Sequence, residues 1–364
     1  MSAQYGMLMP MLVPSPVTTP SAAVAAEETA VLFPRVRWMG SKYRLLPHLA
    51  DVFHEVGGVT ALDAFSGSGV VSYLLKRQGF AVHSNDYLEF PATIARASVV
   101  NQATRLTDVD VERITGPPAD GRRFIQDTFG SVFFTPDDLS FLDSAWSHIA
   151  TLAGHKRALA IAALGLSAAR KQPRGVFTIT GDLSRYDDGR RDLKISLRDH
   201  FVERAIDYNS AVFQGSRCSV SAVEVQNMKP KDYDLVYLDP PYAPPRDDND
   251  YIKRFHFLEG LSRYWEGDTI MPGTKSRKIP KRITPFSTKR TIVEAFRSTF
   301  KQFANSTIVL SYSSNALPGR DELVALLREV KDNVEIIAVP HTYHYGTHST
   351  ATRRLVDEYI FVAS

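Results

Sequence analysis

The segment Leu238-Asp239-Pro240-Pro241-Tyr242 decides how the rest of this 364-residue sequence is interpreted. It directly follows the apolar run Leu235-Val236-Tyr237. A short apolar run that ends in two prolines predicts a buried strand, because proline has no amide hydrogen with which to continue a ladder of hydrogen bonds. We therefore expect the chain to leave a sheet here as a stiff loop that carries one carboxylate and one aromatic ring.

Such a loop is suited to holding an amino group on a flat ring. The exocyclic amine of adenine or cytosine is a poor nucleophile, because its lone pair is delocalised into the ring. Asp239 and the backbone carbonyls of the proline turn can accept the amine hydrogens, which favours the pyramidal nitrogen that attacks an electrophile. Tyr242 offers a face on which the ring stacks. An ordinary Pro-Pro turn with a solvated aspartate is the alternative at this point.

The composition is that of a globular chain, with 44% hydrophobic and 23% charged residues. Its formal net charge of +3 permits a nucleic acid partner without requiring one. The single cysteine, Cys218, excludes an intrachain disulfide and a cysteine-based zinc cluster, so we expect a cytoplasmic protein. No apolar run approaches the ~20 residues of a membrane helix. Residues 1–33, rich in Pro, Ala, Thr and Val, are expected to be a disordered extension.

A second segment predicts a cofactor-binding turn. The run Thr60 to Asp63, the sequence Ala64-Phe65-Ser66-Gly67-Ser68-Gly69 and the apolar residues from Val70 onward predict a strand, a Gly-x-Gly turn and a helix. Glycine lets backbone amides approach a ligand, and a helix N-terminus favours a carboxylate or phosphate. The next predicted strand ends at Asp86, where an acid can bind a ribose hydroxyl. A nicotinamide dehydrogenase would share this geometry, but Ser72 stands where its third glycine belongs.

Basic residues gather in two further regions. Between about residues 104 and 228 the strand–helix rhythm gives way to predicted helices, and arginines surround a candidate strand over Val176 to Thr180. The loop from Thr269 to Val293 has no acidic residue. The candidate DNA contacts are Arg174, Arg190 and Arg191 in the first region and Lys275, Arg277 and Lys278 in the second. Such residues suit phosphate and guanine contacts, and a solvated basic face is the alternative.

Two more groups of residues complete the candidate list. The segment Arg37-Trp38-Met39-Gly40-Ser41-Lys42 precedes a predicted helix from Tyr43 to Val56, which Ser41 is placed to cap. A third sheet strand is expected over Cys218 to Val225, with Glu224 as the acid nearest the adenine ring of a cofactor. Three histidines near residue 345 have no acidic or cysteine partner in their loop, so we expect no metal site.

Three segments in this order resemble the Dam-type DNA adenine-N6 methyltransferases, the D12 or alpha class: Arg37 to Lys42, Asp63 to Gly69, and Asp239 to Tyr242. The resemblance implies an α/β fold with a Rossmann-like, doubly wound, mixed seven-stranded sheet. It also implies a catalytic domain over residues 34–103 and 218–364, with an inserted, mainly helical DNA-recognition unit over 104–217. S-adenosylmethionine would be the cofactor and double-stranded DNA the substrate, and a cognate restriction endonuclease is a partner that the family allows.

The resemblance also assigns roles to individual residues. Trp38, Gly40 and Lys42 would line the methionine end of the cofactor. Asp63, Phe65, Gly67 and Gly69 would wrap the cofactor, Asp86 would bind its ribose, and Glu224 would lie at its adenine. Asp239 and the Pro240 carbonyl would hold the target amine, with Tyr242 stacked on a flipped adenine. Cytosine-N4 methylation and an inactive DNA-binding regulator on the same fold are the alternatives.

Overall fold

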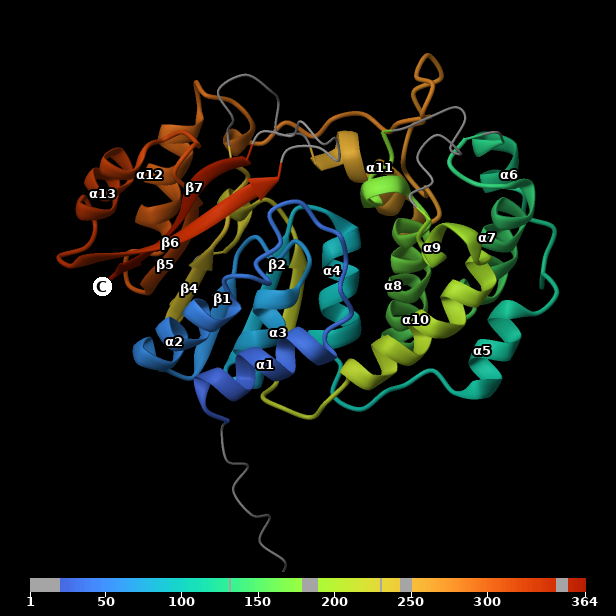
Figure 1. The fold of residues 1–364 in the computed structure, drawn as a ribbon, viewed down its shortest axis with the longest axis horizontal. Coiled ribbons are helices and arrows are strands. Elements are labelled where there is room, and N and C mark those ends of the chain that lie inside the picture. Colours follow the sequence, from blue (N-terminus) through green and yellow to red (C-terminus); the bar gives the residue numbers. More distant parts are fainter. Residues whose placement is uncertain (1–19, 131, 179–188, 230, 243–250, 345–352) are drawn as a thin grey trace, which may run out of the picture.

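A seven-stranded sheet forms the centre of the computed structural model, which describes residues 20–130, 132–178, 189–229, 231–242, 251–344 and 353–364 (Figure 1). Its strand order is β3-β2-β1-β4-β5-β7-β6. The strands are β1 (Thr60–Asp63), β2 (Ala81–Asp86), β3 (Ser219–Ala222), β4 (Leu235–Leu238), β5 (Thr307–Ser313), β6 (Val334–His344) and β7 (Arg353–Ala363). The first five are parallel to one another, whereas β7 runs antiparallel to β5 and β6. The predicted Rossmann-like mixed sheet is confirmed.

Both faces of the sheet are buried, which explains why β4 is continuously apolar. Leu235 and Tyr237 belong to a core with helices α1 (Ala22–Leu32), α2 (Leu46–Val56), α3 (Val70–Arg77) and α4 (Glu89–Ala95). Val236 and Leu238 belong to a second core with α12 (Ile292–Gln302) and α13 (Arg320–Arg328). Because alternate residues of a strand point to opposite faces, a strand covered on both sides needs an apolar residue at every position.

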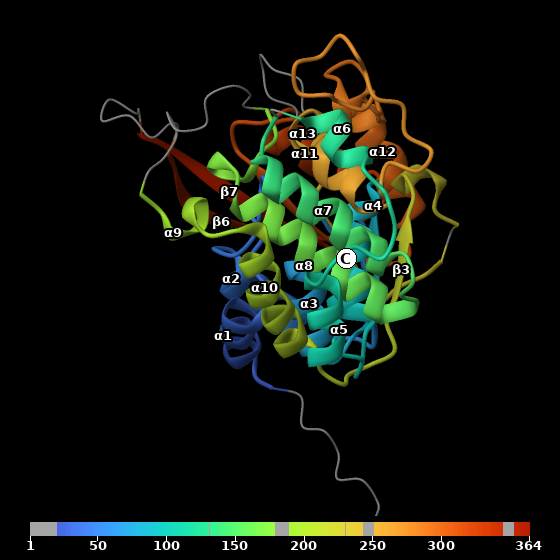
Figure 2. The same ribbon diagram turned by 90° about the vertical axis from the view of Figure 1, so that its right-hand side faces the viewer.

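A group of helices occupies the chain between β2 and β3 and faces the viewer in Figure 2. Its members are α5 (Asp108–Thr115), α6 (Phe124–Phe129), α7 (Pro136–Ile149), α8 (Gly154–Arg170), α9 (Arg191–Lys194) and α10 (Leu197–Ala211). Helix α8 packs on α4 and on α11 (Tyr251–Leu261). Gly165 permits this approach, since a Cβ there would lie 2.3 Å from the ring of Phe90. These helices share one core with the sheet, and the division into two domains stays a prediction.

The structure corrects several local expectations. Residues 22–32, expected to be disordered, form helix α1, where Ala25 and Ala26 are buried against α2. The expected strand from Val176 is wrong over its described residues, which form a turn. Helix α2 begins at Leu46 without a side-chain cap, so Ser41 does not cap it.

The strand order reverses between β1 and β4, and this point positions the site. β2 and β3 continue the sheet on one side, while β5 continues it on the other. Residue Asp63 pairs with Tyr237, and Leu238 pairs with Leu310. The loops that follow β1 and β4 therefore start side by side, at the edge where open α/β sheets bind ligands.

Candidate active site

Asp239 follows β4 and is held by groups from two distant parts of the chain. Its Oδ1 lies 2.7 Å from the ammonium of Lys42 and accepts a hydrogen bond of 3.3 Å from the Ser311 hydroxyl. The same ammonium donates to the Gly40 carbonyl at 2.7 Å, and Gly40 adopts the left-handed φ of 73° that this tight turn requires. Burial raises the pKa of Asp239, and the neighbouring Lys42 opposes that rise.

Trp38 covers the glycine turn. Gly67 has a φ of 46°, and a Cβ there would lie 2.7 Å from the indole nitrogen of Trp38. The indole is stacked on Phe255 of α11, with ring centroids 4.1 Å apart. The first motif segment and the glycine turn are therefore fitted to each other, and only glycine at position 67 allows the contact. Gly69 supports the same turn as the residue that precedes helix α3, with a φ of 82°.

Asp63 is fully buried beneath this turn. The Ser72 hydroxyl donates to its Oδ2 at 2.6 Å, whereas no group among the described residues donates to its Oδ1. Burial raises the pKa of Asp63 to about 7. An acceptor held in this way is suited to a cationic ligand group, which would supply the hydrogen bond that Oδ1 lacks.

Asp86, at the end of β2, is hydrogen-bonded to the glycine turn. Its two carboxylate oxygens accept hydrogen bonds from the backbone N–H groups of Gly67, at 2.9 Å, and Leu88, at 3.0 Å. Burial raises its pKa to about 7. Each carboxylate oxygen can accept a second hydrogen bond, so Asp86 is still able to bind a ribose hydroxyl. That contact stays a prediction.

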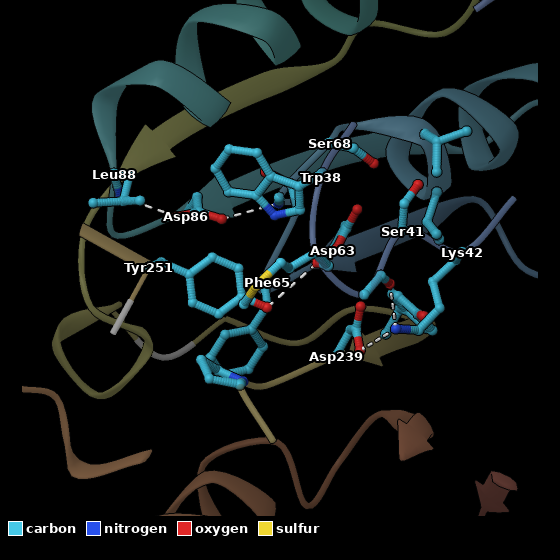
Figure 3. A pocket seen from close by; sticks show the side chains of 18 of the residues that line it. Trp38, Ser41, Lys42, Asp63, Phe65, Ser68, Asp86, Leu88, Asp239 and Tyr251 are labelled. Carbon is cyan, nitrogen blue, oxygen red and sulfur yellow. Dashed lines mark hydrogen bonds and ion pairs between the residues drawn. The ribbon is translucent and has the colours of Figure 1, made fainter. Parts of the chain in front are cut away.

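Seven of the nine predicted cofactor residues line one pocket (Figure 3). Those in its wall are Trp38, Gly40, Lys42, Asp63, Phe65, Gly67 and Asp86. Asp239 also lines it, together with Tyr251 of α11, which sequence reasoning did not select. A neighbouring pocket is lined by Lys42, Asp239, Pro240 and Tyr242. Asp239 and Lys42 thus lie in the wall that the two pockets share.

Glu224 lies apart from this pair of pockets. It follows β3 and lines a third, more apolar pocket with Phe65, Pro241 and Phe286. Phe65 and Pro241 also line the first pocket, so the two cavities adjoin along these side chains. The role of Glu224 at an adenine ring stays a prediction, and this apolar pocket is of a kind that accepts a flat ring.

None of the five predicted DNA contacts whose side chains the structure describes lines a pocket of this site. Arg191 of α9 forms an ion pair with Glu203 of α10, and Arg190 directly precedes α9. Lys275 and Arg277 are exposed on the loop between α11 and α12, with Lys278 half-buried beside them. The side chain of Arg174 lies outside the described residues. Contact with DNA stays a prediction for all six.

Sequence reasoning missed two residues that contact the catalytic loop. Ser311 of β5 donates to Asp239, and Glu358 of β7 accepts a hydrogen bond of 3.0 Å from the Tyr242 hydroxyl. The acidic pair Asp357-Glu358 directly before the apolar run Tyr359 to Val362 was the available signal for Glu358. Among the described residues, no three His, Cys, Asp or Glu side chains are grouped to hold a metal ion. The same part of the chain contains no helix that is long and apolar enough to cross a membrane.

Residues 38–116 match the family model described as D12 class N6 adenine-specific DNA methyltransferase. The type II methyltransferase M2.HphI of Haemophilus parahaemolyticus is 29% identical over 327 residues, which cover 85% of this chain and 92% of that protein. The resemblance to the D12 class that the sequence motifs predicted is confirmed. A second similar protein is modification methylase LlaI of Lactococcus lactis subsp. lactis. It is 23% identical over 338 residues, which cover 86% of this chain and 52% of that protein. The predicted enzyme class, a DNA adenine methyltransferase, is confirmed.

Proposed function

We propose that this D12-class enzyme transfers the methyl group of S-adenosylmethionine to N6 of an adenine that is flipped out of duplex DNA at specific sites. One observation carries the proposal. Asp239 lies in the wall shared by the pocket beneath the glycine turn and the pocket beside Tyr242. A methyl donor in the first pocket and a base in the second would meet at this carboxylate, which is the arrangement that a direct transfer needs.

The residues of the first pocket fit the cofactor. The free Oδ1 of Asp63 suits the ammonium of its methionine part, and Trp38 offers an aromatic wall. The adjoining apolar pocket, bounded by Phe65 and Phe286, suits its adenine ring. When bound, S-adenosylmethionine supplies an electrophilic methyl group on a cationic sulfur. The chain's own residues orient the donor and the target base, and they stabilise the charge that develops during transfer.

The second pocket is suited to hold the target base. Asp239 and the Pro240 carbonyl accept the two hydrogens of the exocyclic amine, and Tyr242 stacks on the ring. A bound donor would supply its methyl group to this nitrogen and leave as a neutral thioether, so positive charge would develop on the nitrogen. Asp239 stabilises that charge and accepts the proton that the nitrogen then loses. Flipping the base costs a few kcal/mol of unstacking, which contacts within the pocket offset.

Methyl transfer from tritiated S-adenosylmethionine to plasmid DNA tests the proposal. The wild-type enzyme is expected to label the DNA, and modification-aware sequencing should locate N6-methyladenine at one recurrent sequence. Labelled cytosine in place of adenine, or cofactor binding without transfer to any DNA, would contradict it.

A cognate restriction endonuclease belongs to the same proposal, because M2.HphI is named a type II methyltransferase. DNA methylated by this enzyme should then resist an endonuclease that cuts at the same sequence. Both activities act on cellular DNA, so we place the enzyme in the cytoplasm.

A further inference from the structure

Glu358 is a buried acid that the proposed reaction leaves without a role. It is 4% exposed, and it lies on β7 opposite Ser313 of β5. Its Oε2 accepts a hydrogen bond of 3.0 Å from the hydroxyl of Tyr242. Carboxylates are rarely buried without a specific partner, because their desolvation is costly. The antiparallel end of the sheet therefore contributes a carboxyl group that contacts Tyr242, a residue in the wall of the pocket for the target base.

The Tyr242 hydroxyl has a second acceptor within reach. It lies 3.5 Å from Oδ1 of Asp239, an oxygen that already faces the Lys42 ammonium and the Ser311 hydroxyl. The shorter contact with Glu358 directs the phenolic hydrogen toward that carboxylate. In the absence of Glu358, Oδ1 of Asp239 is an acceptor within reach of that hydrogen, beside the position that the target amine needs.

Two further groups contact the Tyr242 ring. Tyr312 packs against the ring at 4.9 Å between centroids and an angle of 76°, and the Lys42 ammonium lies 5.1 Å from the ring centroid. Tyr312 and Glu358 come from neighbouring positions of the β5–β7 pair, since Tyr312 pairs with Tyr359. This strand pair therefore contacts both the ring and the hydroxyl of Tyr242.

We propose that Glu358 is a positioning residue. It holds the hydroxyl of Tyr242 so that the ring face is presented to the target base and Asp239 stays available to the amine. The effect on methyl transfer rests on the proposed function, whereas the position of the Tyr242 ring can be measured without catalysis.

The first experiment places 3-fluorotyrosine at position 242 of the full chain and records its ¹⁹F signal without cofactor or DNA. Compared with wild type, E358Q is expected to shift or broaden the signal, because the hydroxyl loses its charged acceptor. E335Q is the matched control, since Glu335 is an exposed acid on the adjacent strand β6, and it should leave the signal unchanged. An identical signal in E358Q and wild type overturns the inference. This experiment tests the inference even if the wild-type enzyme transfers no methyl group. Such a lack of transfer would contradict the proposed function but not the role of Glu358.

The second experiment is a double-mutant cycle with Tyr242→Phe. E358Q keeps the shape of the side chain and should lower kcat about tenfold, the effect of losing a charge-assisted hydrogen bond, with KM for the cofactor changed less than about twofold. In the Tyr242→Phe background, E358Q should have no further effect, because the hydroxyl through which it acts is absent. An equal loss in both backgrounds would show that Glu358 acts by another route and would overturn the inference. Thermal unfolding of each variant confirms that it is folded.

Discussion

The buried cleft between β1 and β4 and the basic loops of the surface hold their charges in opposite ways. In the cleft, Lys42 and Asp239 form an ion pair with little exposure, and Asp86 accepts two backbone N–H groups. On the surface, Arg191 stays exposed while it pairs with Glu203, and Lys275 is exposed as well. A buried charge without a partner costs several kcal/mol, whereas a surface pair contributes about 0–1 kcal/mol.

This difference decides what each region tolerates. Few residue types are tolerated at each position of the cleft, because each buried charge needs a particular partner at a particular distance. Many arrangements of arginine and lysine are tolerated on the surface, because water and salt ions solvate these side chains. We therefore expect substitutions in the cleft to have large, specific effects and substitutions in the basic loops to have small effects that depend on salt.

Asp239→Ala should have the largest effect. Removing the acceptor of the target amine should lower methyl transfer about a thousandfold, the upper end for a group that stabilises transition-state charge. Cofactor binding, measured by calorimetry, should be retained. Asp332→Ala, at an exposed position, is the control. A loss of less than tenfold would remove Asp239 from the reaction.

Lys42→Met should affect stability as well as rate. The variant leaves the Asp239 carboxylate buried without its cation, which should lower the free energy of unfolding by about 3 kcal/mol at neutral pH. Lys42 lowers the pKa of Asp239, so the pKa rises further in the variant. Because transfer needs ionised Asp239, the acidic limb of the rate profile should move to higher pH. Exposed Lys301→Met is the control in denaturant unfolding.

Cofactor affinity should depend on pH through Asp63. Its pKa is raised to about 7, and only the ionised carboxylate attracts the ammonium. Binding of S-adenosylhomocysteine, which has the same ammonium, should tighten up to about tenfold from about pH 6 to about pH 8. Asp63→Asn should weaken binding and flatten this dependence. Asp86 has a similarly raised pKa, so Asp86→Asn shows how much of the dependence it contributes. A pH-independent wild type would exclude the ammonium contact.

Neutralising the basic loop should have the smallest and most salt-dependent effect. Replacing Lys275, Arg277 and Lys278 by Gln should reduce the slope of log affinity for DNA against log salt by about 3. Cofactor affinity should not change. The control replaces three basic residues of α12 and α13: Arg297, Lys301 and Arg320. Equal slopes for both triple variants would show that the loop does not contact phosphate.

The cleft could be predicted from sequence to a large extent, because its features are local. Pro240 and Pro241 end a strand wherever they occur, and Gly67 is required where a Trp packs on the backbone. The basic loops could not be assigned with the same precision, since phosphate contact depends on how long side chains are directed. Helix α1 was missed because its small residues, including Ala25 and Ala26, show no clear periodicity and are ordered by burial against α2.

By itself, the sequence determined the order of the motifs, the apolar strand before Asp239 and the turn at Gly67, because these depend on backbone chemistry within a few residues. Only the tertiary structure decided that Asp239 forms the wall between two pockets and that Glu358 contacts Tyr242. Those contacts arise from the pairing of strands distant in sequence, β1 with β4 and β5 with β7. The periodicity within a strand does not specify its partner, so such contacts appear only when the sheet is assembled.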